Sequence, residues 1–279
     1  MKNISLGYSP CPNDTFIFYA LTHNKINTGE LHFDEVLLDV ETLNQKALKA
    51  ELDVTKISYA AFGHLRKDYC LLRSGGALGR GCGPLVITKQ DYEMKDLRDK
   101  KVAIPGNLTT AYLLLQLYDN SFSSSNIIPM PFHEIMQAVS KGEVDTGVII
   151  HESRFTYQSY GLKEIIDLGN WWEKETGLPI PLGGIVARRS LGDSLIKQVD
   201  ESIKQSILYA FDNRQRPVDY IKQHSQELSD DVINQHINLY VNDFSVDLGD
   251  EGKKAVRELL SRAEEAGVIP KISNSLFIS

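Results

Sequence analysis

The feature that most constrains the fold is a regular alternation of strand-like and helix-like stretches. The predicted strands cover 3–8, 31–39, 53–58, 100–106, 127–132, 145–151 and 183–189. The predicted helices between them cover 14–23, 40–52, 59–67, 109–119 and 133–143. Beyond residue 190 the pattern is helical, over 193–212, 215–224, 229–241 and 249–266. This alternation predicts an α/β fold with a largely parallel sheet.

Two parts of the chain, residues 43–62 and 132–155, share one order of elements. Each has a helix, an acidic turn, an aspartate that opens a strand, and a polar or aromatic residue at the strand's end. When the two are aligned on Asp53 and Asp145, Tyr59 falls opposite His151. Any αβ unit has this general plan, but it also fits two similar lobes whose strands end at a shared cleft. Open α/β sheets bind ligands at the carboxyl ends of their strands.

The two-lobe interpretation divides the chain in a definite way. We expect lobe one to consist of residues 1–92 and 190–279, with the C-terminal helices completing it. Lobe two, residues 93–189, is then an insertion. With 279 residues and 42% hydrophobic content, the chain has enough apolar side chains for two modest cores.

Charge and cysteine content exclude several classes of partner. The net charge is −7, which argues against a nucleic-acid-binding surface because such a surface needs a basic stripe. A small anionic ligand remains compatible with this charge. The three cysteines, Cys11, Cys70 and Cys82, form no CxxC pair, and no HxH or HExxH pair is present. We therefore expect no disulfide framework, no metal site and a reducing compartment.

The N-terminal residues resemble neither a signal peptide nor a membrane anchor. Gly7 and Pro10 interrupt the short apolar run that follows Met1. Nowhere does an apolar window approach the length of a membrane span. The sequence thus predicts a cytoplasmic protein without a membrane span.

The segment "SPCPNDTF" follows the first predicted strand. Its two prolines keep the chain extended, and Asn13 or Asp14 can cap the next helix by accepting a backbone N–H. One interpretation is an ordinary strand-to-helix turn. The other is a rigid wall that presents Ser9, Asn13, Asp14 and Thr15 to a ligand.

Two further strand ends carry hydroxyl groups. Thr109 and Thr110 begin the helix of 109–119, where backbone N–H groups and hydroxyls favour a carboxylate or phosphate. Simple capping by threonine explains the same residues. Ser58 ends the strand of 53–58 in a similar position, and the glycine-rich segment 73–87 is interpreted as the crossover into lobe two.

His151 is the candidate proton-transfer residue. It comes directly after the apolar run "GVII", so we expect it where a buried strand ends. Its unperturbed pKa lies near neutrality, which suits a general base. A histidine that merely ends a strand is the alternative. The other histidines occupy predicted helices or an alternating strand and have weaker context.

Several blocks together resemble one enzyme family. The segments "GYSPCPNDTFIFYAL", "TKISYAAF", "GRGCGPLV", "GVIIHESRFTY" and "GLPIPLGGIVARR" resemble the 1,4-dihydroxy-6-naphthoate synthases, bacterial enzymes of the futalosine route to menaquinone. The resemblance is strong from residue 4 to about residue 190 and looser through the helical tail. It implies a type II periplasmic-binding-protein-like fold with a ligand cleft between two lobes.

The resemblance also implies a reaction and a set of site residues. The family cleaves cyclic dehypoxanthinyl futalosine to 1,4-dihydroxy-6-naphthoate and dihydroxyacetone, a lyase reaction that needs no cofactor. Its catalytic histidine matches His151, and its substrate-contacting segments match Lys56-Ile57-Ser58 and Thr109-Thr110. Ser9, Asn13 and Asp14 are then expected to form the wall of the cleft in lobe one.

Other functions fit parts of the pattern. A solute-binding protein for a small aromatic or carboxylate ligand shares this architecture, although the missing signal peptide argues against it. Chorismate dehydratase is a related enzyme, but the pair "SPCPNDTF" and "IIHESRF" favours the synthase. A ligand-sensing module is usually attached to a DNA-binding or signalling domain, and this sequence leaves too few residues for such a domain.

Overall fold

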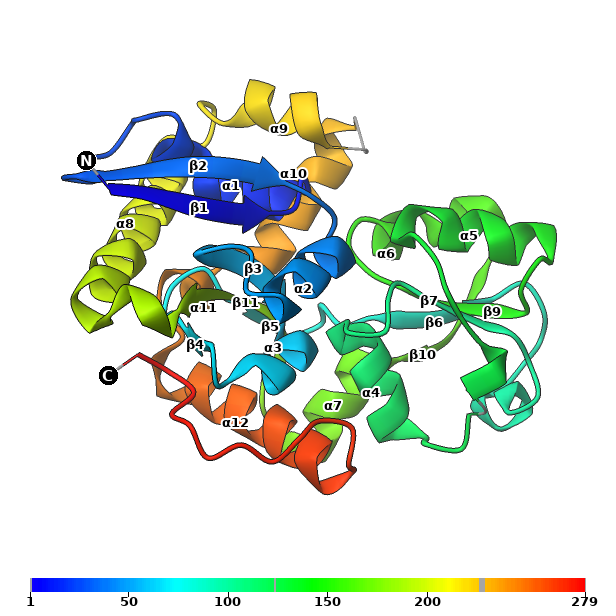
Figure 1. The fold of residues 1–279 in the computed structure, drawn as a ribbon. Helices are drawn as coiled ribbons and strands as arrows, with labels where there is room; N and C mark the ends of the chain where they lie inside the picture. Colours follow the sequence, from blue (N-terminus) through cyan, green and yellow to red (C-terminus); the bar gives the residue numbers. More distant parts are fainter. Residues whose placement is uncertain (1, 123, 226–228, 279) are drawn as a thin grey trace. The chain divides into compact units, whose positions relative to one another are not determined.

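The computed structural model describes residues 2–122, 124–225 and 229–278. It divides into two compact units, one of residues 1–79 with 181–279 and one of residues 80–180 (Figure 1). The boundaries differ from those expected because residues 85–88 pair with strands of the second unit. Likewise, residues 183–188 pair with strands of the first unit.

The first unit contains a mixed sheet of six strands. The strands are β1 (Lys2–Tyr8), β2 (Leu31–Leu37), β3 (Val54–Ser58), β4 (Tyr69–Leu71), β5 (Ala77–Gly79) and β11 (Ile180–Arg188). Their order is β2-β1-β3-β11-β4, and β5 pairs with β11. β1 is parallel to β2 and β3, whereas β11 is antiparallel to β3 and β4. The expectation of a largely parallel sheet therefore fails at β11, where the chain re-enters the sheet in the opposite direction.

The second unit repeats this plan in a five-stranded sheet. Its strands are β6 (Leu85–Thr88), β7 (Val102–Ile104), β8 (Ile127–Pro129), β9 (Thr146–Ile149) and β10 (Lys163–Asp167). Their order is β10-β6-β9-β7-β8. β7 is parallel to β8 and β9, and β6 is antiparallel to β9 and β10. Read from the other edge, β8-β7-β9-β6 corresponds to β2-β1-β3-β11 of the first unit.

Two aspartates occupy equivalent positions in the two sheets. The Asp53 carboxylate accepts a hydrogen bond from the Ser5 backbone N–H at 3.1 Å, and Asp145 accepts one from the Lys101 N–H at 2.9 Å. In both cases the aspartate precedes its strand by one residue, and the donor lies one residue before the first residue of the neighbouring parallel strand that pairs with it. The alignment on these aspartates thus corresponds to a real structural repeat.

Helices cover the sheets of both units. Those of the first unit are α1 (Pro12–Thr22), α2 (Val40–Leu48), α3 (Tyr59–Leu65), α8 (Asp193–Asp212), α9 (Val218–His224), α10 (Asp230–Tyr240), α11 (Asp243–Val246) and α12 (Gly249–Glu265). Those of the second are α4 (Thr110–Tyr118), α5 (Phe132–Lys141), α6 (Ser153–Thr156) and α7 (Leu168–Thr176). Across the described residues, no helix combines the length and the apolar character needed to cross a membrane.

Helix α1 lies at the centre of the first unit. It packs against α8, α9 and α10 as well as against the sheet, and its residues from Pro12 to Leu21 are buried. A helix covered on all sides must be apolar around its whole circumference, which explains the run "FIFYAL". This burial fixes the first turn of α1, where the "SPCPND" segment ends.

Candidate active site

The "SPCPND" segment enters α1 earlier than the sequence suggested. Proline suits the first turn of a helix because that position needs no backbone donor, so the helix begins at Pro12. The Cys11 carbonyl accepts from the N–H groups of Asp14 and Thr15 at 3.1 and 3.0 Å. The expected capping by Asn13 or Asp14 is therefore wrong. Both residues lie within the first turn, and their side chains bond elsewhere.

The Asp14 carboxylate is the centre of a buried polar cluster. One oxygen accepts from Lys56 Nζ at 2.5 Å and from Asn13 Nδ2 at 2.7 Å. The other accepts from Ser9 Oγ at 2.9 Å and from the Ser9 N–H at 3.2 Å. The Lys56 and Asp14 side chains are only 7% and 6% exposed. Such a pair holds its charges away from water only because the carboxylate is so fully hydrogen-bonded.

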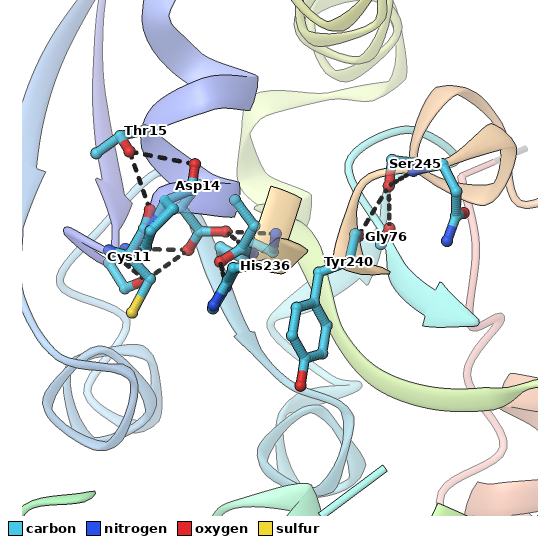
Figure 2. Close-up of polar contacts among 12 residues, drawn as sticks. Cys11, Asp14, Thr15, Gly76, His236, Tyr240 and Ser245 are labelled. Carbon is cyan, nitrogen blue, oxygen red and sulfur yellow. Dashed lines mark hydrogen bonds and ion pairs between the residues drawn. The ribbon is translucent and has the colours of Figure 1, made fainter. Parts of the chain in front are cut away.

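His236 joins the same cluster from the C-terminal helices. Figure 2 shows it beside the Asp14 segment, and its Nε2 lies 2.9 Å from Asn13 Oδ1. The ring is fully buried. The sequence offered no signal for this contact beyond a histidine in a predicted helix, because 223 residues separate the partners.

The side chains of Lys56, Ile57 and Ser58, which are consecutive in β3, lie in different surroundings. Lys56 reaches Asp14, whereas the Ile57 side chain lies in the apolar interior with 1% exposure. The Ser58 N–H donates to Asn44 Oδ1 at 3.0 Å, and its hydroxyl accepts from Asn44 Nδ2 at 3.3 Å. Asn44, which sequence reasoning missed, therefore orients the end of β3 from helix α2.

Thr109 acts as the N-cap of α4 in the second unit. Its hydroxyl accepts from the Tyr112 N–H at 3.3 Å and donates to the Gly106 carbonyl at 2.8 Å. The hydroxyl proton is thus used within the turn, which agrees with the capping interpretation. Thr110 is the first residue of the helix and is buried.

His151 adopts an unusual backbone conformation. It follows β9 with a φ of +57°, in the left-handed region. Among the described residues, Asn24 and Ala50 are the other non-glycine residues with positive φ. Such a conformation costs free energy and persists where the surroundings hold it, often at functional sites. The His151 ring lies 5.0 Å from the Phe132 ring, centroid to centroid.

Arg154 fastens the turn that follows His151. Its guanidinium donates to the Gly83 carbonyl and to the Asp167 carboxylate, both at 2.6 Å. The other Asp167 oxygen accepts from the first backbone N–H groups of α7. One arginine thereby ties "HESRF" to the glycine-rich segment and to α7. Sequence reasoning missed this role, although "HESRF" had already been singled out.

Cys70 and Cys82 are poorly suited to nucleophilic chemistry. Cys11, Cys70 and Cys82 are buried, and no disulfide joins them. Burial raises the pKa of Cys70, and it raises the pKa of Cys82 to about 12. Because the thiolate is the reactive form, these two side chains are poor nucleophiles at neutral pH.

Comparison with known proteins identifies the family. A family model described as "Menaquinone biosynthesis" matches residues 4–265. A Thermus thermophilus protein is 49% identical over 278 residues, covering 100% of both chains. A Streptomyces coelicolor protein is 46% identical over 272 residues, covering 96% of this chain and 95% of its own. Both are named 1,4-dihydroxy-6-naphthoate synthase. The chain belongs to the 1,4-dihydroxy-6-naphthoate synthase family.

Solved structures show how widely the fold of this family occurs. Protein AF1704 from Archaeoglobus fulgidus matches with a TM-score of 0.90 and 37% identity, covering 96% of this chain and 98% of its own. A Candida albicans protein described as having the generic periplasmic binding protein fold matches with a TM-score of 0.71 and 14% identity, covering 98% and 92%. The synthase family thus shares the periplasmic-binding-protein fold with distant proteins, so the fold alone does not decide its function.

Proposed function

We propose that this protein is a carbon–carbon lyase that converts cyclic dehypoxanthinyl futalosine to 1,4-dihydroxy-6-naphthoate and dihydroxyacetone in menaquinone biosynthesis. The observation that carries the proposal is full-length identity of 46–49% to two proteins named for this product. The buried polar cluster around Asp14 and the left-handed turn at His151 supply chemistry suited to the reaction.

In the proposed mechanism His151 is the general base. It removes a proton from the cyclised, non-aromatic substrate, and the carbon–carbon bond to the sugar-derived fragment breaks as the ring becomes the aromatic dihydroxynaphthoate. The imidazolium returns the proton to the group that received the electron pair of the broken bond, and dihydroxyacetone leaves. The gain of aromaticity provides much of the driving force, so the protein's task is positioning and proton transfer. Phe132 and the left-handed backbone support a fixed orientation of the imidazole.

The first unit supplies substrate-binding groups in this proposal. Lys56 has three ammonium hydrogens, and one bonds Asp14, so it has donors to offer an anionic or carbonyl oxygen of the substrate. Ile57 takes part through its backbone because its side chain is buried in the core. Ser58, Ser9 and Asn13 complete the polar surface around them.

The second unit supplies the group for the substrate carboxylate. The first turn of α4, with Thr109 as its cap and Thr110 as its first residue, favours an anion through its backbone N–H groups. Since the Thr109 hydroxyl already donates to Gly106, we assign the contact to backbone N–H groups and to Thr110.

The decisive experiment pairs the wild type with His151→Asn. Asparagine tolerates the left-handed backbone better than most residues and has no imidazole to accept a proton. With cyclic dehypoxanthinyl futalosine, mass spectrometry should detect both products from the wild type. The variant should keep its melting temperature and lose about 10²–10⁴-fold in kcat.

Each other outcome overturns a defined part of the proposal. Equal turnover by both proteins would keep the lyase and remove His151 as the base. No product from the wild type, together with a rise in melting temperature on adding the compound, would favour a solute-binding protein. Turnover of chorismate in its place would favour the related dehydratase.

A further inference from the structure

We propose that His236 is a positioning residue for the lyase reaction, acting by fixing the side-chain amide of Asn13. The inference rests on the proposed function, because it concerns the polar cluster that we assign to substrate binding. His236 lies on α10, far along the chain from the segments that resemble the family motifs. It does not itself belong to the groups proposed to touch substrate.

The orientation of the Asn13 amide follows from its two partners. Its Nδ2 lies 2.7 Å from the Asp14 carboxylate, which only accepts hydrogen bonds. The Oδ1 atom therefore faces His236 at 2.9 Å, and the Nε2 atom of the imidazole must be the donor. If the amide turned over, its oxygen would face the carboxylate and its NH₂ group would face the imidazole N–H. Each partner thus holds the amide against rotation.

Fixing Asn13 also fixes the charges behind it. The Asp14 oxygen that accepts from Asn13 is the same oxygen that accepts from Lys56 Nζ at 2.5 Å. The order of contacts is His236, Asn13, Asp14 and Lys56, and all four side chains are buried. A shift of the amide would change the hydrogen bonding of Asp14 and, through it, the position of the Lys56 ammonium.

The surroundings of His236 hold its ring in place. The ring packs on Tyr240, with 4.7 Å between ring centroids. The carbonyl of Tyr240 accepts from Ser245 Oγ at 3.4 Å, and the same hydroxyl lies 2.9 Å from the Gly76 carbonyl (Figure 2). The end of α10 is thereby joined to the segment before β5, so the imidazole rests on a supported helix rather than on a loop.

The test compares two substitutions at one position. His236→Gln keeps an N–H donor at a similar reach, whereas His236→Leu removes it at similar volume. For a positioning residue we expect His236→Leu to lower kcat about 10–100-fold with a folded protein, and His236→Gln to recover most of the loss. The double variant with Asn13→Ala should lose no more in kcat than the greater of the two single losses.

A purely structural role predicts a different pattern. In that case His236→Leu would lower the melting temperature and leave the kcat of the folded fraction within about twofold of wild type. That result, equal defects in the Leu and Gln variants, or fully multiplicative losses in the double variant would each overturn the proposal.

A measurement without substrate separates this inference from the proposed reaction. In protein carrying ¹⁵N-labelled histidine, NMR should show His236 with its proton on Nε2, and Asn13→Ala should shift that signal while the other histidines keep theirs. A proton on Nδ1 would overturn the inference even if the lyase is active. If the wild type shows the expected tautomer but no lyase activity, the contact between His236 and Asn13 stands and the proposed reaction is wrong.

Discussion

At the scale of single residues, the site depends on groups whose partners lie far away in the sequence. The "SPCPND" segment was singled out from its prolines and polar residues, and its placement after the first strand is confirmed. Its partners Lys56 and His236 come from β3 and α10. A sequence pattern does not predict such pairs, because a hydrogen bond between two side chains depends on where the fold places them.

The Lys56–Asp14 pair leads to a prediction about stability. Lys56→Met leaves a buried carboxylate without its counter-charge, so we expect the free energy of unfolding to fall by about 3–5 kcal/mol. Adding Asp14→Asn removes the uncompensated charge while keeping an acceptor for Ser9, and should recover at least about 1 kcal/mol. Urea denaturation measures both. A single variant as stable as the wild type would contradict the burial of this pair.

At the scale of elements, a close backbone contact joins the start of β6 to helix α7. Gly83 precedes β6 and Gly169 lies in the first turn of α7, and a Cβ on Gly83 would lie 2.3 Å from the Gly169 Cα. Real Cβ atoms do not approach backbone so closely. Gly83 of "GRGCG" is therefore explained by packing against α7, whereas the sequence alone indicates only a crossover into lobe two.

This contact predicts unequal costs for two glycine substitutions. Gly83→Ala must push α7 away from its backbone neighbour, and we expect it to destabilise by about 3 kcal/mol or more. Gly161→Ala is the control, because Gly161 has a φ of +69° and open space where a Cβ would be. Its cost should be about 1–2 kcal/mol, from the left-handed backbone alone. Thermal unfolding compares them, and equal losses would contradict the close approach.

At the scale of the whole molecule, buried tyrosines govern how stability depends on alkaline pH. Burial raises the pKa of Tyr69 to about 12 and raises the pKa values of Tyr8, Tyr59 and Tyr220 as well. In the unfolded chain all four titrate near their ordinary value of about 10. Above that pH the unfolded state has released protons that the folded state keeps, so the unfolded state is favoured.

We therefore expect the stability contributed by these tyrosines to be fully present below about pH 10 and to fall as the pH rises through 12. Each of the four tyrosines should contribute a loss of about 1.4 kcal/mol per pH unit in this range. Melting temperatures between pH 9 and 12, followed together with phenolate absorbance, test this. Phenolate formation should coincide with unfolding for these residues. Their titration near pH 10 in a folded protein would contradict it.

The sequence predicts part of the strand arrangement of the whole chain. The alternation of elements and the similarity around Asp53 and Asp145 predicted an α/β protein with repeated units, and the two sheets do share one strand order. The sequence does not predict that β6 belongs to the sheet of the second unit and β11 to that of the first. Which sheet a strand joins depends on long-range pairing, and local periodicity is the same in either sheet.

The sequence by itself determined seven strands and nine helices, the internal repeat and the motif segments of the synthase family, because these follow from local periodicity, turn chemistry and residue order. It did not predict the strands β4, β5, β6 and β10 or the helix α7. Only the tertiary structure decided that Asn13 and Asp14 lie within the first turn of α1 and not at its cap, and that His151 has a left-handed backbone conformation. It also decided that the His236 imidazole contacts the Asn13 amide. The reason is physical: each depends on burial and on partners brought together by packing, and the free energy of those contacts exists only in the folded chain.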